Sequence, residues 1–152
     1  MAVSFMTEEG LKMLFETILL QYGFEKQRYI YVRDFGSFLL RLSLQPSLGS
    51  EDYHLDCYFL IKELHEKSVL ITFLVADITN RQKFVINEKE TEIIKIEDLK
   101  FEDTSKILRS AISDVVTLVE SGGLKGYLEK YPEAIKSAPT GSMPYFEKLG
   151  II

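Results

Sequence analysis

The sequence predicts an α+β fold: a mainly antiparallel, twisted sheet of about four to six strands, with an N-terminal helix and C-terminal helices packed on it. Three patterns lead to this prediction. A helical repeat opens the chain, alternating and continuous apolar segments fill its middle, and a long amphipathic stretch follows them. Strands in one block followed by helices are typical of α+β rather than parallel α/β folds. The length of 152 residues fits a single domain, residues 1–152.

The first helix is expected to begin after Thr7 and to end before Gly23. Thr7 can cap the helix with its hydroxyl, and Gly23 can adopt the left-handed conformation that commonly ends a helix. The apolar residues between them recur at the spacing of one helical face: Leu11, Leu14, Phe15, Ile18, Leu19 and Tyr22.

A β-hairpin is expected next, with strands at residues 27–33 and 37–45, which are rich in β-branched, aromatic and leucine residues. We interpret Asp34-Phe35-Gly36 between them as a three-residue loop whose glycine takes the left-handed position. Pro46 ends the second strand, because proline cannot donate a hydrogen bond to a ladder.

This loop fixes the pairing of the two strands, and the pairing assigns each residue to a face. Val32 opposite Phe38 then lies on the core face, together with Ile30. Tyr29 opposite Arg41 lies on the other face, as does Tyr31 opposite Leu39.

A third strand is expected at residues 53–62, where apolar and polar residues alternate. Cys57 falls on the core side of this strand and is expected to act as a small hydrophobic residue. His54, Asp56 and Tyr58 fall on the opposite side.

Further strands are expected in the second half of the sheet. The continuous apolar run at residues 69–75 is typical of a strand buried on both faces. Residues 84–86 and 92–96 are interpreted as a short hairpin around 87–90, although Glu88-Lys89-Glu90 is also compatible with a helix start.

Helices are expected at residues 103–120 and 124–130, separated by Gly122-Gly123. The first of them has an apolar stripe wide enough to lie across a sheet. The last segment, residues 137–152, is too apolar for a free tail. Two interpretations remain open for it: docking back onto the domain, or binding a partner.

Composition excludes several classes of function. The net charge is −5 and the 18 basic residues are scattered singly, which argues against nucleic-acid binding. No apolar run approaches the roughly 20 residues that span a bilayer, and no secretory signal is present, so we expect a cytoplasmic protein. The single cysteine cannot form an intrachain disulfide.

Catalytic and metal-binding patterns are sparse. His54 and Asp56 lie two residues apart on one face of a strand, an arrangement that can orient an imidazole. With His65 they could form a metal site, but a solvated ion pair explains the two residues better, and zinc requires three or four ligands. We therefore expect no cofactor, no metal and no catalytic residues.

The second face of the first three strands is the most informative surface. It combines tyrosine, arginine and histidine, which are enriched where proteins bind partners. The expected partner-binding residues are Tyr29, Tyr31, Arg41, Gln45, His54, Asp56 and Tyr58. Two arrangements are compatible with the sequence: this face is open, or a later helix covers it.

Residues 11–62 resemble a family of small bacterial proteins of unknown function. The resemblance rests on a helix that ends in Tyr22-Gly23-Phe24-Glu25-Lys26 and on a strand that ends in Leu42-Ser43-Leu44-Gln45-Pro46-Ser47. Some members of that family resemble immunity or accessory proteins beside toxin genes. The resemblance implies a non-enzymatic protein that masks a partner.

The leading hypothesis is therefore a protein-binding or immunity-type module rather than an enzyme, with an unidentified protein as partner. A small hydrolase or metal-dependent enzyme that uses His54, Asp56 and Arg41 is the alternative from another class. A third hypothesis is a structural protein that self-associates through its apolar C-terminus. A homo-oligomer is compatible with each of the three.

Overall fold

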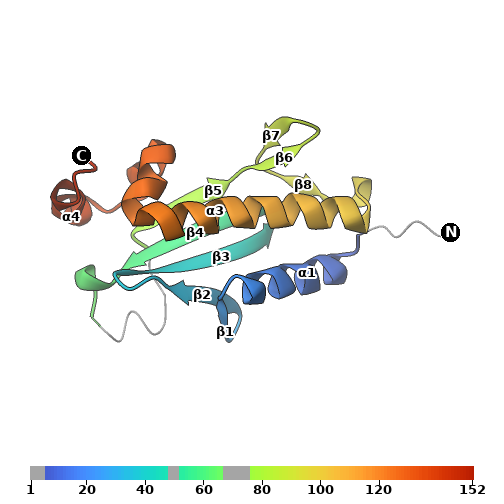
Figure 1. Ribbon diagram of the computed structural model, residues 1–152, viewed down its shortest axis with the longest axis horizontal. Coiled ribbons are helices and arrows are strands. Elements are labelled where there is room, and N and C mark those ends of the chain that lie inside the picture. Colours follow the sequence, from blue (N-terminus) through green and yellow to red (C-terminus); the bar gives the residue numbers. More distant parts are fainter. Residues whose placement is uncertain (1–5, 48–51, 67–75) are drawn as a thin grey trace.

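The computed structural model describes residues 6–47, 52–66 and 76–152 and confirms the α+β prediction (Figure 1). The strand predicted at residues 69–75 lies outside the described residues. The helices and strands are α1 (Glu8–Gln21), β1 (Glu25–Gln27), β2 (Ile30–Asp34), β3 (Phe38–Pro46), β4 (Asp52–Ile61), β5 (Ile78–Gln82), β6 (Phe84–Ile86), β7 (Lys89–Thr91), β8 (Ile94–Lys95), α3 (Phe101–Lys130) and α4 (Met143–Lys148).

The main sheet is antiparallel, with strands in the order β1-β2-β3-β4-β5. The short strand β8 also pairs with β4, at the start of that strand. Strands β6 and β7 form a separate two-stranded hairpin. Because β3 and β4 pair over nine positions, from Phe38–Ile61 to Pro46–Tyr53, they form the centre of the sheet.

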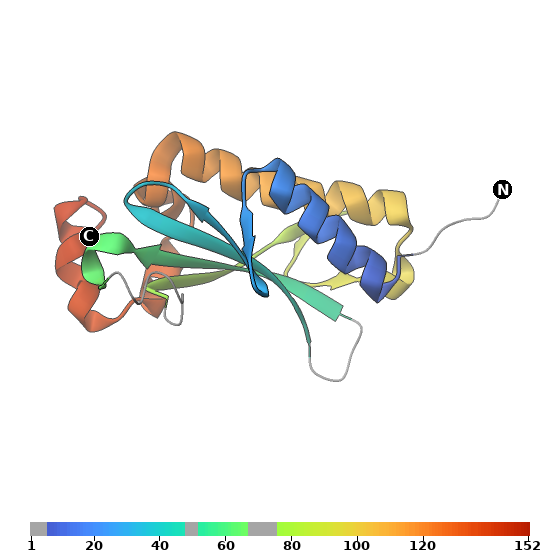
Figure 2. The same cartoon turned by 90° about the horizontal axis from the view of Figure 1, so that it is seen from below.

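The helices α1 and α3 both lie on one side of the sheet (Figure 2). Their apolar stripes share one cluster with the inward-facing residues of the central strands, such as Leu40, Leu42 and Phe59. The same cluster includes Phe146 of α4. We call the side of the sheet that faces these helices the core face.

Helix α1 has the ends that the sequence predicts. The Thr7 hydroxyl accepts a hydrogen bond from the Gly10 amide at 3.0 Å, which satisfies one of the free donors of the first turn. Gly23, just beyond the helix, has a φ of 83°. A side chain at that position would be strained, which explains the glycine there.

The predicted β2–β3 register is wrong. Val32 was expected opposite Phe38 and Tyr31 opposite Leu39, but Val32 pairs with Arg41 and Tyr31 with Leu42. The Phe35 amide also donates to the Phe38 carbonyl at 3.0 Å, so only Gly36 and Ser37 remain in the loop. Two-residue loops of this kind place glycine first, with positive φ, and Gly36 has a φ of 94°.

The corrected register moves β2 by an odd number of residues, which exchanges its two faces. Tyr31, expected opposite Leu39, lies on the core face. Ile30 and Val32, expected on the core face, lie on the opposite side with Leu39. The faces of β3 and β4 agree with the prediction, because Leu40 and Cys57 are buried in the core.

The strand predicted at residues 27–33 is divided into two. Gln27 of β1 pairs with Ile30 of β2, so Arg28 and Tyr29 form the tight turn between them. Arg28 has a φ of 60°, which a turn of this kind requires. Tyr29 therefore lies at a hairpin tip rather than on a sheet face.

The later strands match the prediction only in part. Residues 84–86 do form one arm of a hairpin, but the other arm is β7 rather than residues 92–96. Asn87 and Glu88 form its turn, and both have positive φ. Ile94 of β8 instead pairs with Tyr53 of β4. Strand β5 had not been predicted at all.

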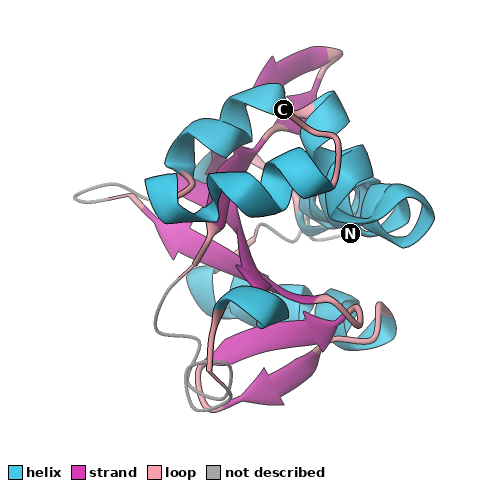
Figure 3. Ribbon diagram, turned by 90° about the vertical axis from the view of Figure 1, so that its left-hand side faces the viewer, coloured by secondary structure: helices cyan, strands magenta, loops and turns pink. Residues whose placement is uncertain are grey.

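The C-terminal half is helical where the sequence predicts it. The long helix α3 changes direction at Gly123, whose φ of 62° and ψ of −159° are not helical. The predicted break at Gly122-Gly123 therefore corresponds to a kink between two helical segments. The following turns lie at one end of the sheet, on the left in Figure 1 and toward the viewer in Figure 3.

These C-terminal turns pack on the rest of the chain. Tyr145 and Phe146 are buried in the core cluster. The Ser137 hydroxyl accepts a hydrogen bond from the Thr79 amide at 2.9 Å, so it satisfies a donor of β5. Such cover protects a strand from unwanted pairing.

Candidate binding site

The face of the sheet opposite the helices carries a cluster of polar side chains, which we call the second face. Pairing of β3 with β4 places Arg41 beside Tyr58, Ser43 beside Asp56, and Gln45 beside His54. Five of the seven predicted partner-binding residues therefore share one surface. The residues of the second face are Arg41, Ser43, Gln45, His54, Asp56, Tyr58 and Arg81.

Asp56 lies at the centre of this polar cluster. Its carboxylate contacts His54 Nε2 at 3.3 Å and Arg81 Nε at 3.2 Å, and its side chain is only 15% exposed. Arg81 was missed in the sequence because strand β5, which pairs it with Asp56, was not predicted. Residues 78–82 read Ile-Thr-Asn-Arg-Gln, with only one apolar residue, so no apolar–polar alternation in the sequence marks this strand.

Arg41 and Tyr58 form the second part of the cluster. The Arg41 guanidinium carbon lies 5.1 Å from the centre of the Tyr58 ring, within the range of a cation–π contact. Burial raises the pKa of the Tyr58 hydroxyl, the Asp56 carboxylate raises it further, and Arg41 opposes this effect. Tyr58 therefore keeps its proton at neutral pH and can donate a hydrogen bond.

Two nitrogen atoms of this surface are buried without a hydrogen-bond partner in the described part of the chain: Arg41 Nε and His54 Nδ1. His54 Nε2 faces Asp56, so it carries the ring hydrogen and leaves Nδ1 as an acceptor in the neutral imidazole. An unpaired buried polar group costs about 1–3 kcal/mol of stability. Such groups are uncommon in folded proteins and call for an explanation.

An apolar patch adjoins the polar cluster on the same side of the sheet. Val32 and Leu60 are buried there, with Ile30, Leu39 and Tyr58 packed against them. This patch was not expected, because the predicted register had placed Ile30 and Val32 in the core. All five residues belong to strands, and no helix of the described residues contributes to the patch.

The two remaining predicted residues, Tyr29 and Tyr31, lie elsewhere. Tyr31 is on the core face, where its ring packs edge-to-face with that of Phe15 of α1. The two ring centres are 5.8 Å apart. Tyr29 is 95% exposed at the tip of the β1–β2 hairpin. The structure therefore does not bring these tyrosines into the polar cluster.

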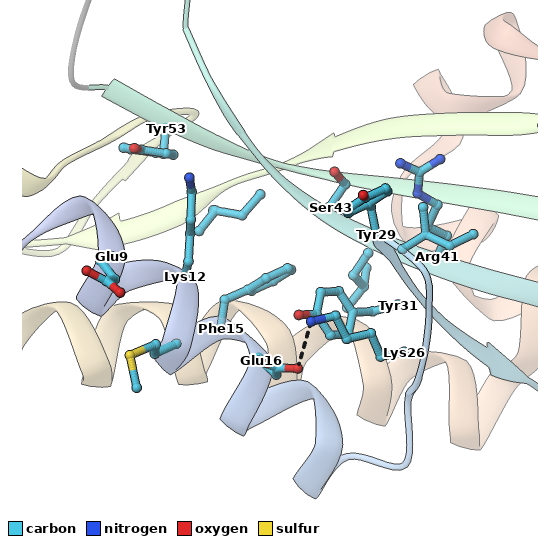
Figure 4. A pocket seen from close by; sticks show the side chains of 14 residues that line it. Glu9, Lys12, Phe15, Glu16, Lys26, Tyr29, Tyr31, Arg41, Ser43 and Tyr53 are labelled. Atoms are coloured by element: carbon cyan, nitrogen blue, oxygen red, sulfur yellow. Dashed lines mark ion pairs between the residues drawn. The ribbon is translucent and has the colours of Figure 1, made fainter.

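Tyr29 and Tyr31 instead line a groove between α1 and β3, which we call the α1 groove (Figure 4). Its volume is about 390 Å³. Lys26 bridges part of it, with Nζ 3.3 Å from Glu16 Oε1 and 5.9 Å from the centre of the Tyr31 ring. The residues that line it are Glu9, Lys12, Met13, Phe15, Glu16, Lys26, Tyr29, Ile30, Tyr31, Arg41, Leu42, Ser43, Leu44 and Tyr53.

The metal site considered for His54, Asp56 and His65 is not assembled. His65 Nε2 instead lies 2.8 Å from both carboxylate oxygens of Asp77, which is buried. Within residues 6–47, 52–66 and 76–152, no three histidine, cysteine or acidic side chains are grouped to hold a metal ion. None of the helices in these ranges combines the length and apolar character needed to cross a membrane.

Cys57 lies on the core face, away from His54. Its thiol is 3.8 Å from Gln82 Oε1, which also accepts a hydrogen bond from the Tyr127 hydroxyl at 3.2 Å. Gln82 Nε2 in turn donates to the Tyr131 hydroxyl at 2.8 Å. This buried network ties the end of α3 to the sheet, so Cys57 belongs to the core rather than to a reactive site.

Cys57 should be inert to alkylation in the folded protein. Burial raises the pKa of its thiol to about 12, so almost no thiolate forms at pH 8. We expect no iodoacetamide adduct after incubation of the native protein at pH 8, and complete modification in concentrated urea. Intact-protein mass spectrometry measures both. Rapid alkylation of the native protein would contradict the buried environment of this thiol.

No family model, curated protein or solved structure matches the chain. The resemblance of residues 11–62 to an immunity-type family therefore stays a prediction.

Proposed function

We propose that the protein is a non-enzymatic binding module and that a protein partner docks on the second face of its sheet. The observation that carries the proposal is the pair of buried, unpaired nitrogen atoms, Arg41 Nε and His54 Nδ1. A docked partner that draws the two side chains outward, and that supplies an acceptor for Arg41 Nε and a donor for His54 Nδ1, would remove a cost of about 1–3 kcal/mol for each of them. Binding energy would then be concentrated at these two residues.

The surroundings of the two atoms support the same proposal. The helices α1, α3 and α4 contribute to the cluster on the core face, whereas the apolar patch of the second face contains strand residues only. Tyr58, with its protonated hydroxyl and its ring beneath Arg41, is the kind of residue that dominates protein interfaces. The immunity-type role that the resemblance implies is one form of such a module.

The alternative hypotheses gain less support. The His54–Asp56 pair could orient an imidazole for general-base catalysis. However, Ser43, the hydroxyl residue beside Asp56, has its oxygen close to Gln45 Nε2 rather than to His54. The apolar C-terminus invoked for self-association has Tyr145 and Phe146 buried within its own chain.

Substitution of Arg41 tests the proposal directly. We expect Arg41→Ala to weaken capture of the partner from host lysate by at least about tenfold, as is typical of a central arginine in an interface. Immobilised wild-type protein and variants are compared by quantitative mass spectrometry of the captured proteins. Arg109→Ala is the matched control, because Arg109 lies on α3, where it donates a hydrogen bond to Gln21 Oε1 at 2.7 Å.

Circular dichroism and urea unfolding of both variants establish that they are folded. A protein that is captured by the wild type and Arg109→Ala but lost with Arg41→Ala supports the proposal. Equal capture by all three would show that the second face is not the binding surface. Loss of capture with Arg109→Ala alone would place the binding surface on the helices.

A further inference from the structure

The edge of β3 is unpaired along the α1 groove. The β2–β3 ladder ends at the pair Tyr31–Leu42, whereas β3 continues to Pro46 and stays paired with β4. In the part of the chain that the structure describes, no other strand pairs with β3 beyond Leu42. The next residue of β2 toward the β1–β2 hairpin tip, Ile30, pairs with Gln27 of β1, so the position beside β3 beyond Leu42 holds no paired strand of the described residues.

The direction of the backbone groups shows what this edge offers. Phe35 N donates to Phe38 O, and Lys62 N donates to Ser37 O. The backbone N–H and C=O groups of even-numbered β3 residues therefore point toward β2, and those of odd-numbered residues point toward β4. These directions alternate along an antiparallel strand. Leu44 consequently directs both its N–H and its C=O into the vacant position, where an added strand would find a donor and an acceptor.

The residues that line the α1 groove indicate that it runs along the edge of β3. Four consecutive residues of β3, Arg41 to Leu44, line it. Successive residues of a strand point to opposite faces, so a cavity that touches all four must run along the edge. Phe15 of α1 and Tyr53 of β4 contribute aromatic rings to the lining, at separate places along the groove (Figure 4).

The charges at the Arg41 end of the groove favour an acidic ligand there, whereas Glu9 lines the opposite end, on α1 (Figure 4). Lys26 is neutralised by Glu16 at 3.3 Å, and Lys12 by Glu8 at 3.4 Å. Arg41 has a cation–π contact with Tyr58 but no ion pair with any described residue, and its Nε is buried without a hydrogen-bond partner. A carboxylate beside Ser43 on the second face would provide the missing counter-charge.

We infer that the α1 groove binds an extended, acidic peptide segment of a partner protein, which adds as a strand to the edge of β3. The residue that pairs with Leu44 places an apolar side chain against the aromatic lining of the groove. The side chains of the two peptide residues on either side of it point to the second face, where a carboxylate contacts Arg41. In strand addition of this kind, backbone hydrogen bonds provide the affinity, and every second side chain of the added strand provides the specificity. The inference rests on the proposed binding function, because Arg41 belongs to both surfaces.

The test uses the full chain, labelled with ¹⁵N, and the synthetic peptide acetyl-Ser-Asp-Phe-Asp-Ser-amide. We expect saturable binding with a Kd of about 1 mM or lower. The amide proton of Leu44 should move downfield as it becomes hydrogen-bonded. The matched peptide with lysine in place of both aspartates should bind at least about tenfold more weakly, as should the acidic peptide to Arg41→Gln.

Two methylated peptides test the strand geometry without any change to the protein. Methylation of the phenylalanine nitrogen removes the donor that faces the Leu44 carbonyl, so affinity should fall at least about tenfold. Methylation of the nitrogen of the preceding aspartate should change it by less than about twofold, because that N–H points away from β3.

Each of the following results would overturn the inference: no binding of the acidic peptide, equal binding of the two methylated peptides, or equal binding of the lysine peptide. Dimerisation that the acidic peptide reverses, measured by sedimentation, would make a second copy of the chain the occupant and would also overturn it. If the peptide fails while Arg41→Ala still abolishes capture of a lysate protein, strand addition is wrong and the proposed function stands. If capture also survives that substitution, both are wrong.

Discussion

Replacement of Phe146 with alanine is expected to lower the free energy of unfolding by about 3–4 kcal/mol, in the range measured for large-to-small core substitutions. Phe146 lies in α4 and is fully buried. Its ring packs in the same cluster as the helices α1 and α3. Removal of the ring therefore leaves a cavity in the main core. Equilibrium unfolding in urea, followed by circular dichroism, measures the change.

Ile152→Ala provides the matched control, because Ile152 is also a large apolar residue of the C-terminal segment but is 56% exposed. We expect it to change the free energy of unfolding by less than about 0.5 kcal/mol. If both variants unfold at the same urea concentration as the wild type, the C-terminal segment does not contribute to the core. The apolar C-terminus would then again be available for a partner.

Asp77→Ala is the second substitution with a large expected effect, about 3 kcal/mol of lost stability. Asp77 is buried, and its Oδ2 accepts a hydrogen bond from the Ile61 amide at 2.7 Å. Both of its carboxylate oxygens also lie 2.8 Å from His65 Nε2. Alanine leaves the Ile61 amide buried without an acceptor and removes the partner of the imidazole. Urea unfolding again measures the effect.

Asp114→Ala serves as the control for a lost carboxylate, since Asp114 lies on the exposed side of α3. A change within about 0.5 kcal/mol is expected there. The Asp77 contacts would carry little energy if Asp77→Ala were as stable as Asp114→Ala. The connection between the end of β4 and the start of β5 would then have to depend on other interactions.

Local patterns predicted the elements better than their pairing. The helical face of α1 and the alternation of β3 and β4 were readable because burial repeats at the period of each structure. The β2–β3 register was not, because both alternating sets of the predicted strand at residues 27–33 are apolar or aromatic: Ile30 and Val32 in one set, Tyr29 and Tyr31 in the other. Only the loop could decide between them, and Gly36 suits both a two-residue and a three-residue loop.

The candidate site shows the same limit. Arg41, Gln45, His54, Asp56 and Tyr58 were predicted on one face from alternation within two well-patterned strands. Arg81 was not predicted, because its contact with Asp56 depends on the pairing of β4 with β5, which no short-range pattern determines. The α1 groove could not be predicted either, since it arises where β2 leaves β3 and where α1 crosses beside them.

We propose that a partner protein contacts the second face of the sheet. Site-specific photo-crosslinking tests it most directly, with a photoreactive phenylalanine analogue at Arg81 on the second face or at Ser110 on α3. The side chain of Arg81 is 45% exposed, so the analogue can reach a bound protein. We predict a covalent product with the captured partner from position 81 and none from position 110. A product from position 110 alone would contradict the claim and would assign binding to the helical side.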